Sequence, residues 1–401
     1  MDLHRYLMRG TGFYDWMIRT GPGANLEQAM ANLEPDKPAP ALRPLPTVNL
    51  LDGTDDQYVD ALIEEALPHD RAPFRRYMAD RPLGLGIITA VSSICPLVTR
   101  FFPPSFIARQ LTLSQGPGSS RTTLLSVAGL AMQHSIGKIF CSGPSGTAVN
   151  KLAYRLNDVT ASVCGRYNNG KEKGDPSRAR RKLVVRGFNI AHETQAVWKM
   201  LQHPDRDPAL SNRAAWILPL SVAYWFLAVL WSKAKGIKEL DEDDSEALHQ
   251  MRQDLEKRAD FKKLRALATG EMTWAEWAAL KDGVKIVPIL DKIVCSADLL
   301  CTTPAMSAQD KSPYLWYKYE IAMGVLINEA ANMNRADYAC VAGNCLLPCI
   351  MGGDPKQQRP VVMTGMAKDG LGHFHHRLAK DGAISPLLFF QTSGIPVYRL
   401  G

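Results

Sequence analysis

The sequence predicts an α/β protein built on a parallel sheet that is interrupted by a helical insertion. Short apolar runs alternate with helical patterns near both ends of the chain, and each run leads into a turn of small or polar residues. Such alternation is typical of strand–helix–strand units in a parallel sheet. Between about residues 190 and 285 the pattern changes to helices alone, which predicts the insertion.

Length and composition narrow the classes of protein that fit. The 401 residues suffice for two or three domains, and 46% hydrophobic and 22% charged residues exclude wholesale disorder. A formal net charge of +7 permits nucleic-acid binding without requiring it. The first residues lack the apolar core of a signal peptide, so we expect an intracellular protein, cytoplasmic or nuclear, with reduced thiols.

Residues 1–80 are predicted to form an N-terminal helical extension, and 81–401 the sheet domain. An amphipathic helical pattern covers 1–33, and residues 34–46 read EPDKPAPALRPLP, which is typical of an extended linker. One or two further helices are expected over 55–82, ending at Pro82. The run 83–90, LGLGIITA, is the first predicted strand.

Later segments repeat this plan. Residues 138–156 carry a strand, a small-residue loop and a helix, and strand-like runs return at 292–305, 324–331 and 346–357. The apolar stretch 214–231 is nearly long enough to span a bilayer. Pro219 and Ser221 interrupt it, so we favour a buried helix over a membrane span and expect no membrane partner.

Four turns follow candidate strands, at the sheet edge where such folds build ligand sites. The first resembles a phosphate loop, in which glycines let backbone N–H groups surround phosphates, a lysine binds them and a hydroxyl binds Mg²⁺. Here Arg121 stands at the lysine position, Thr122 at the hydroxyl position, and Ser120 replaces a glycine. A plain Gly/Ser loop is the alternative. The whole candidate loop comprises Gly116, Pro117, Gly118, Ser119, Ser120, Arg121, Thr122 and Thr123.

The order of these turns resembles the first RecA-like domain of superfamily 1 helicases. Residues 116–122, GPGSSRT, match helicase motif I; 142–150, SGPSGTAVN, match the next motif; 328–331, NEAA, match the D-E-A-A of motif II; and 353–360, GDPKQQRP, match motif III. The segments 297–307 and 389–400 are similar to further family segments. The likeness covers about residues 80–400 and is greatest to the branch of nonsense-mediated-decay and Okazaki-processing helicases, with large fungal helicase-like proteins nearest.

The resemblance implies a P-loop NTPase fold, ATP with Mg²⁺ as cofactor, and single-stranded RNA or DNA as partner. It implies that Glu329 activates water, that Asn328 and Thr122 occupy the Mg²⁺ position, and that Gln357 senses the γ-phosphate. Asp354 of motif III would also lie at the nucleotide. Contacts with the nucleic-acid backbone would come from Ser145, Thr147 and Asn150.

The sequence departs from the family at the catalytic positions. Asn328 brings no negative charge to Mg²⁺, and the planar guanidinium of Arg121 differs from the point charge of lysine. Gln358 and Arg359 replace the Leu-Pro of motif III, and residues 91–115 separate the first strand from its phosphate loop. A translated intron would explain that insertion, with a surface loop as the alternative. Because a helicase closes ATP between two RecA-like domains, we expect no processive unwinding by this chain alone.

Two functional interpretations follow. The chain is a degenerate ATP-dependent helicase domain with weak or absent hydrolysis, or a non-catalytic module that binds nucleic acid or acts as a scaffold for a protein partner. A chance match of the four motifs is a third alternative. The basic segment 165–182 favours nucleic-acid contact, against a solvated loop. The acidic-then-basic segment 239–271 is expected to be a solvated helix.

Two metal hypotheses carry less weight. Cys340, Cys345 and Cys349 do not have a zinc spacing, and we expect buried core cysteines. The histidines 373, 375 and 376 are expected in a surface loop rather than at a metal.

Overall fold

The computed structural model describes residues 46–53, 55–90, 117–206, 216–280, 283–343, 347–356, 359–362, 367–373, 375 and 379–400. The expected helical pattern at 1–33, the proline-rich segment up to residue 45 and the insertion 91–115 lie outside these residues.

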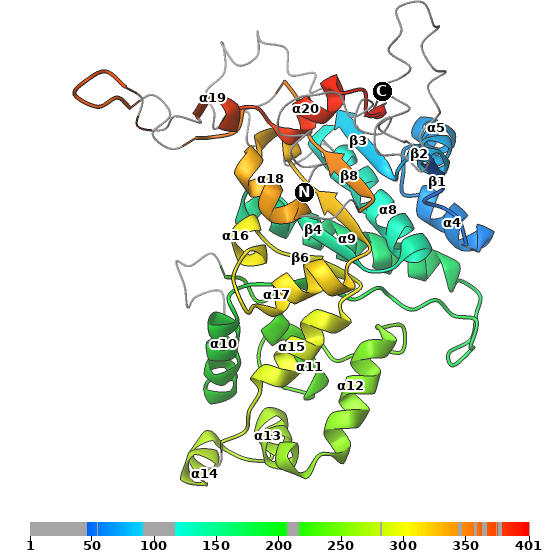
Figure 1. Cartoon of the computed structure of the whole chain (residues 1–401). Coiled ribbons are helices and arrows are strands. Elements are labelled where there is room, and N and C mark those ends of the chain that lie inside the picture. Colours follow the sequence, from blue (N-terminus) through cyan, green and yellow to red (C-terminus); the bar gives the residue numbers. More distant parts are fainter. Residues whose placement is uncertain are drawn as a thin grey trace, which may run out of the picture.

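A seven-stranded, all-parallel sheet forms the centre of the molecule, in the order β5-β6-β4-β7-β8-β3-β9 (Figure 1). The predicted α/β class is confirmed, and the sheet is consistent with a RecA-like fold. Both neighbours of β3 come from the last part of the chain, since β3 pairs with β8 and β9. The strands are β3 (Leu85–Ala90), β4 (Ile139–Ser142), β5 (Val184–Arg186), β6 (Leu299–Cys301), β7 (Gly324–Ile327), β8 (Cys349–Gly352) and β9 (Val397–Leu400).

Two long helices, α8 (Pro117–Ile136) and α9 (Gly146–Tyr167), pack side by side against the sheet. The buried positions of α9 recur every three or four residues, as expected for a helix with one core-facing side. α4 (Asp56–Ile63) packs on the outer side of this helix pair. α5 (Pro68–Ala79) contacts β9. β1 (Thr47–Val48) and β2 (Arg81–Pro82) pair with each other beside α4 and α5 (Figure 1). The expectation of one or two helices over 55–82 is confirmed, since α4 and α5 are two separate helices.

Between β5 and β6 the chain forms helices, which Figure 1 shows extending away from the sheet. They are α10 (Ile190–Gln202), α11 (Val222–Val229), α12 (Glu246–Lys257), α13 (Ala259–Thr269), α14 (Trp274–Ala279) and α15 (Val287–Ser296). The second half of the apolar stretch forms α11, whose side chains are almost all buried, so the expectation of a buried helix is confirmed there. No helix in the described part of the chain is both long and apolar enough to cross a bilayer.

The run 292–305 is less strand-like than expected. Its first residues end α15, and only Leu299–Cys301 form a strand. The reason is helical spacing: Ile289, Leu290, Ile293 and Val294 bury one side of α15 after Pro288 in its first turn.

The rest of the chain is short helices between strands. Before β7 lie α16 (Pro304–Ser307), α17 (Pro313–Trp316) and η2 (Tyr317–Ile321); after it come η3 (Ala330–Asn332), α18 (Arg335–Ala342), α19 (Ala379–Gly382) and α20 (Pro386–Thr392).

A buried carboxyl group joins the helical segment to the sheet. Glu193 in α10 is fully buried and accepts hydrogen bonds from the backbone N–H groups of Phe188, after β5, and Ala223, in α11. The indole of Trp216 donates a third. Burial raises the pKa of Glu193 to about 7, even though these donors favour the charged form.

We expect the stability of the protein to fall as pH rises from about 4.5 to about 7. Over that range Glu193 ionises in the unfolded chain but stays protonated in the folded one, which favours unfolding. The contribution of this group is on the order of 3 kcal/mol. Urea titrations at several pH values should show that the free energy of unfolding depends less on pH in Glu193→Gln than in the parent protein.

The matched control is Glu271→Gln, at an exposed position outside this contact. The stability of this variant should depend on pH as that of the parent protein does. An unchanged slope in Glu193→Gln would show that Glu193 does not hold its proton in the folded state.

Candidate functional site

The carboxyl ends of neighbouring strands are joined by buried side-chain hydrogen bonds. The Thr302 hydroxyl donates to the carbonyl of Gly187, and the Ser142 hydroxyl donates to the carbonyl of Thr302. The backbone N–H of Asn328 then donates to the carbonyl of Ser142. These bonds continue across the ends of β5, β6, β4 and β7, so the turns that follow those strands are held at one edge.

A buried ion pair lies at this edge. Nη2 of Arg121, in α8, is 2.5 Å from Oε1 of Glu329, directly after β7. The Arg121 side chain is only 2% exposed and that of Glu329 17%. Glu329 has a left-handed backbone with φ of 53° and ψ of 37°, which is unusual for a residue with a side chain. The structure therefore brings together the residues at the predicted lysine and water-activating positions, and joins them to each other.

Asn328 is oriented by its amide group. Its Nδ2 donates to the carbonyl of Ala148, in the first turn of α9, at 3.0 Å. The same side chain is fully buried, and among the residues that the structure describes its Oδ1 has no hydrogen-bond partner. Because only the nitrogen of the amide can donate to a carbonyl, a carboxylate could not replace it here.

The predicted phosphate loop is largely helical. Pro117–Thr123 form the first two turns of α8, and Gly116 lies outside the described residues. A proline at the first helical position is preorganised for a helix, which explains this early start. Thr122 and Thr123 are both buried, and Ser120 and Thr123 line a cavity on a different side of α8 from Arg121.

Motif III is described in part. Gly353 follows β8, and any side chain there would overlap Leu387 and the backbone N–H of Ala331, which explains the glycine. Asp354 is 1% exposed, and its Oδ1 accepts the N–H of Lys356 at 2.9 Å. β8 is the neighbour of β7 in the sheet. Asp354 follows β8 and Glu329 follows β7, so the two residues lie after neighbouring strands. Gln357 and Gln358 lie outside the described residues.

The three predicted nucleic-acid contacts lie together at the N-terminal end of α9. Ser145 caps the helix by accepting the N–H of Ala148, and both Ser145 and Thr147 are exposed. Asn150 is engaged within the protein, because its Oδ1 accepts from Nε of Arg186 at 2.7 Å. Burial lowers the pKa of Arg186 to about 10. The sequence analysis missed Arg186, for which the only signal was its place at the end of a strand.

This arrangement does not fit a Mg²⁺–nucleotide complex. Mg²⁺ prefers carboxylate and water oxygens, but Asn328 is neutral and offers only the amide oxygen Oδ1, since its Nδ2 is bound to the carbonyl of Ala148. One oxygen of Glu329 is bound to Arg121, whose charge would repel a metal ion at the same place. The helical backbone of Pro117–Ser119 also lacks the turn that surrounds phosphates.

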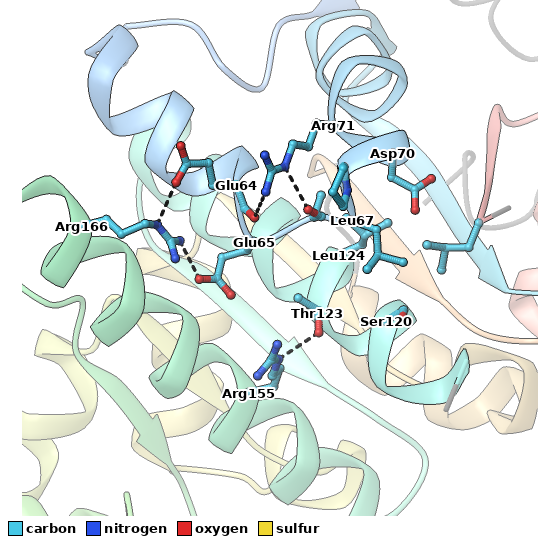
Figure 2. A pocket seen from close by; sticks show the side chains of 13 residues that line it. Glu64, Glu65, Leu67, Asp70, Arg71, Ser120, Thr123, Leu124, Arg155 and Arg166 are labelled. Atoms are coloured by element: carbon cyan, nitrogen blue, oxygen red, sulfur yellow. Dashed lines mark hydrogen bonds and ion pairs between the residues drawn. The ribbon is translucent and has the colours of Figure 1, made fainter. Parts of the chain in front are cut away.

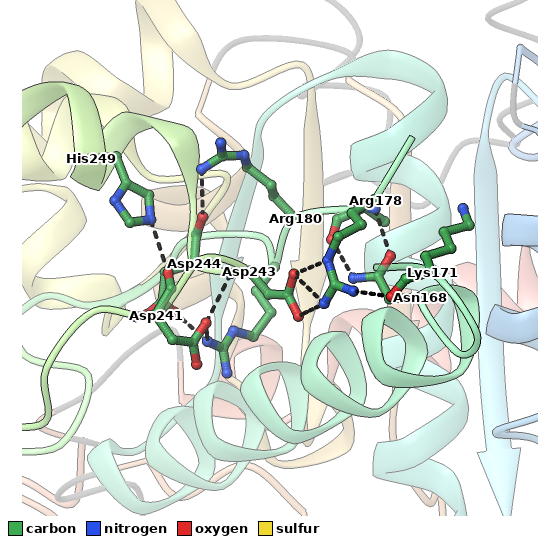
Figure 3. Close-up of polar contacts among 10 residues, drawn as sticks. Asn168, Lys171, Arg178, Arg180, Asp241, Asp243, Asp244 and His249 are labelled. Atoms are coloured by element: carbon green, nitrogen blue, oxygen red, sulfur yellow. Dashed lines mark hydrogen bonds and ion pairs between the residues drawn. The ribbon is translucent and has the colours of Figure 1, made fainter. Parts of the chain in front are cut away.

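The basic segment 165–182 is paired with the acidic segment that follows Glu239. Arg178 makes a bidentate contact with Asp243, at 2.8 and 2.6 Å from its two oxygens (Figure 3). Arg180 contacts Glu246 at 2.9 Å, and Arg181 contacts both Asp241 and Asp244. Three of the four arginines of the basic segment are therefore paired with side chains of the acidic segment, and the Arg180–Glu246 pair is exposed.

The metal hypotheses gain no support. Within the described ranges no group of three or more histidine, cysteine or acidic side chains could hold a metal ion. Cys340 and Cys349 are free thiols, and Cys345 lies outside the described residues. His373 is exposed beside Asp369, and His376 is not described.

No protein-family model matches the chain, and no curated protein is significantly similar to it. The resemblance to helicases therefore depends on the quoted motifs and on the fold.

We predict that Asn328→Asp destabilises the protein and does not restore nucleotide hydrolysis. The new carboxylate would face the carbonyl of Ala148 in a site without solvent, where an unpaired buried acceptor costs about 2 kcal/mol or more. Urea denaturation measures this loss.

Asn189→Asp is the control, because the side-chain oxygen that caps α10 is kept. It should leave stability nearly unchanged. Equal stability of Asn328→Asp and the parent would contradict the assigned orientation of the amide.

We also expect Arg178 and Asp243 to be energetically coupled. A double-mutant cycle with Arg178→Ala and Asp243→Ala should give a larger coupling than the same cycle on Arg258 and Asp260, a more exposed pair. Stability in urea is the measurement. Equal coupling in the two cycles would show that the basic segment is not fixed by the acidic one.

Proposed function

We propose that the chain is a RecA-like domain of helicase ancestry that binds single-stranded RNA or DNA and does not hydrolyse ATP. The observation behind the proposed lack of ATP hydrolysis is the buried contact between Arg121 and Glu329. This contact occupies one oxygen of the carboxylate that would have to activate water. The neutral Asn328 removes the charge that would attract Mg²⁺.

The order of the strands supports the helicase ancestry. The turn that resembles motif III follows β8, the turn that resembles motif II follows β7, and the turn that resembles the motif after I follows β4. These three strands are successive neighbours in the order β9-β3-β8-β7-β4. Chance matches could follow any strand of the sheet, whereas these three follow strands that are direct neighbours.

Helix N-termini at the same edge support nucleic-acid binding. β5, β6 and β4 are neighbours, and each leads into a helix; the side chains of Asn189 and Ser145 cap two of these helices, and Thr303 stands at the N-cap position of the third. Backbone N–H groups at helix N-termini attract phosphates. Thr147 and Lys151 are exposed on the first two turns of α9 and would lie beside such a phosphate.

Thr147→Glu should weaken the binding of a single-stranded oligonucleotide by about tenfold, because a carboxylate would face the phosphate. The variant should fold, since an acidic residue in the first turn stabilises a helix. Fluorescence anisotropy at low and high salt measures the affinity, and Thr147→Gln is the uncharged control of equal size. Equal affinities of the Glu and Gln variants would exclude this end of α9.

ATP hydrolysis should be absent with Mg²⁺ and with Mg²⁺ chelated. Mg²⁺-dependent turnover would contradict the second part of the proposal. If no oligonucleotide binds in a salt-dependent manner, the protein-scaffold alternative is favoured.

A further inference from the structure

Arg186, the last residue of β5, carries a buried positive charge that no carboxylate pairs with in the described part of the chain. The residue is only 3% exposed. Burial lowers the pKa of Arg186 to about 10, so the guanidinium is still charged near pH 7. Glu193 also acts on this charge, but its carboxyl group holds a proton up to about pH 7. A buried charge is costly unless an opposite charge lies near it, and a bound anion would supply that charge.

Three contacts fix the direction of this guanidinium. Nε donates to Oδ1 of Asn150 at 2.7 Å, Nη1 donates to the carbonyl of Gly187, and Cζ lies 4.1 Å from the centre of the Phe188 ring. Nη2 lies beside Gly146, where a β-carbon would be 3.9 Å from it. Because Gly146 and Asn150 are four residues apart, they share one face of α9. The guanidinium therefore extends along that face toward the start of the helix.

Nη2 of Arg186 is open to a ligand. The structure encloses other guanidinium nitrogens completely and without an acceptor, among them Nη1 of Arg81 and Nε of Arg121. Nη2 of Arg186 also lacks an acceptor among the described residues, but it is not enclosed in this way. Apart from α9 itself and the adjacent residues, it is the one described atom within 4 Å of the β-carbon position at Gly146. The absence of a side chain at Gly146 thus leaves room beside the charge.

The first turn of α9 provides backbone donors at the same place. Ser145 accepts the N–H of Ala148 with its hydroxyl and the N–H of Val149 with its carbonyl. The N–H groups of Gly146 and Thr147 precede these two and have no acceptor in the described part of the chain. Such groups at the start of a helix carry partial positive charge and bind oxyanions.

We propose that Arg186 and the first turn of α9 form a site for one phosphate group. Nη2 of Arg186 and the N–H groups of Gly146 and Thr147 would donate to the phosphate oxygens, and Asn150 positions the guanidinium. The inference rests on the function proposed above in that the phosphate would belong to the backbone of a bound single strand. Free inorganic phosphate has the same chemistry, and the experiment distinguishes the two sources.

Gly146→Asp and Gly146→Asn test this site as a matched pair. The aspartate would place a carboxylate beside Nη2 of Arg186 and take the place of the phosphate, whereas the asparagine adds a side chain of the same size without the charge. Both variants should fold, because a β-carbon at Gly146 meets Nη2 at an ordinary contact distance. Gly146→Asp should unfold at a higher temperature than Gly146→Asn, since the buried charge gains a partner.

Calorimetric titration of the whole chain with inorganic phosphate, at constant ionic strength, measures the affinity of the site. We expect this affinity to fall at least about tenfold in Gly146→Asp relative to Gly146→Asn. Arg186→Gln should weaken phosphate binding as well, and the Gly146 pair decides the question if Arg186→Gln does not fold. Arg155→Gln should bind phosphate like the parent. Arg155 lies on the opposite side of α9, where its Nε donates to Thr123 at the edge of a cavity (Figure 2).

Fluorescence anisotropy with a single-stranded oligonucleotide identifies the source of the phosphate. If Gly146→Asp loses phosphate and the oligonucleotide together, the site takes a phosphate of the strand. If it loses phosphate alone, the site takes free phosphate, and a parent protein that binds no oligonucleotide would then contradict only the nucleic-acid function.

Equal phosphate affinities of Gly146→Asp and Gly146→Asn, or no phosphate binding by the parent, would overturn the site. Salt-dependent oligonucleotide binding in that case would leave the nucleic-acid function standing.

Discussion

A guanidinium that has lost almost all contact with water requires an opposite charge, and Arg121 has Glu329. Removing one partner of a buried pair leaves an uncompensated charge, which costs about 3–5 kcal/mol. The pair also holds the start of α8 against the end of β7, and it accompanies a left-handed backbone at Glu329 that costs about 1 kcal/mol or more without such support. The same contact that stabilises this edge thus occupies one oxygen of the Glu329 carboxylate.

The edge depends equally on neutral groups. Thr302, Ser142 and Asn328 extend the hydrogen bonding of the sheet beyond the last paired residues. Each turn begins at a fixed point, and the helices that follow are aligned with their N-termini at one side. At the β5 end the buried Glu193 joins α10 and α11 to Phe188, two residues after β5. The bond between Arg178 and Asp243 is a second contact between that segment and residues that precede β5.

Much of the fold could be predicted because strands of a parallel sheet are buried on both sides and appear as short apolar runs. The placement of Asn328 and Glu329 directly after such a run was predictable for the same reason. Three features were not. The helix at Pro117 replaces a loop because local glycine and serine content does not decide between a turn and a proline-started helix. The partner of Arg178 lies 65 residues away, so its neutralisation depends on tertiary contacts. The cavity at Arg155 is formed by packing between distant segments, and no periodicity indicates it.

The position of β3 has a consequence for folding during synthesis. Its two neighbours in the sheet, β8 and β9, begin at Cys349 and Val397, so its backbone edges have no strand partner until more than 250 further residues have been made. At ribosomal rates this takes on the order of tens of seconds. In the finished protein the hydroxyl of Tyr77 in α5 accepts the N–H of Ile87 and donates to its carbonyl. This contact is local in sequence and can form early, and it would shield the middle of an apolar strand from intermolecular pairing while the chain is still growing.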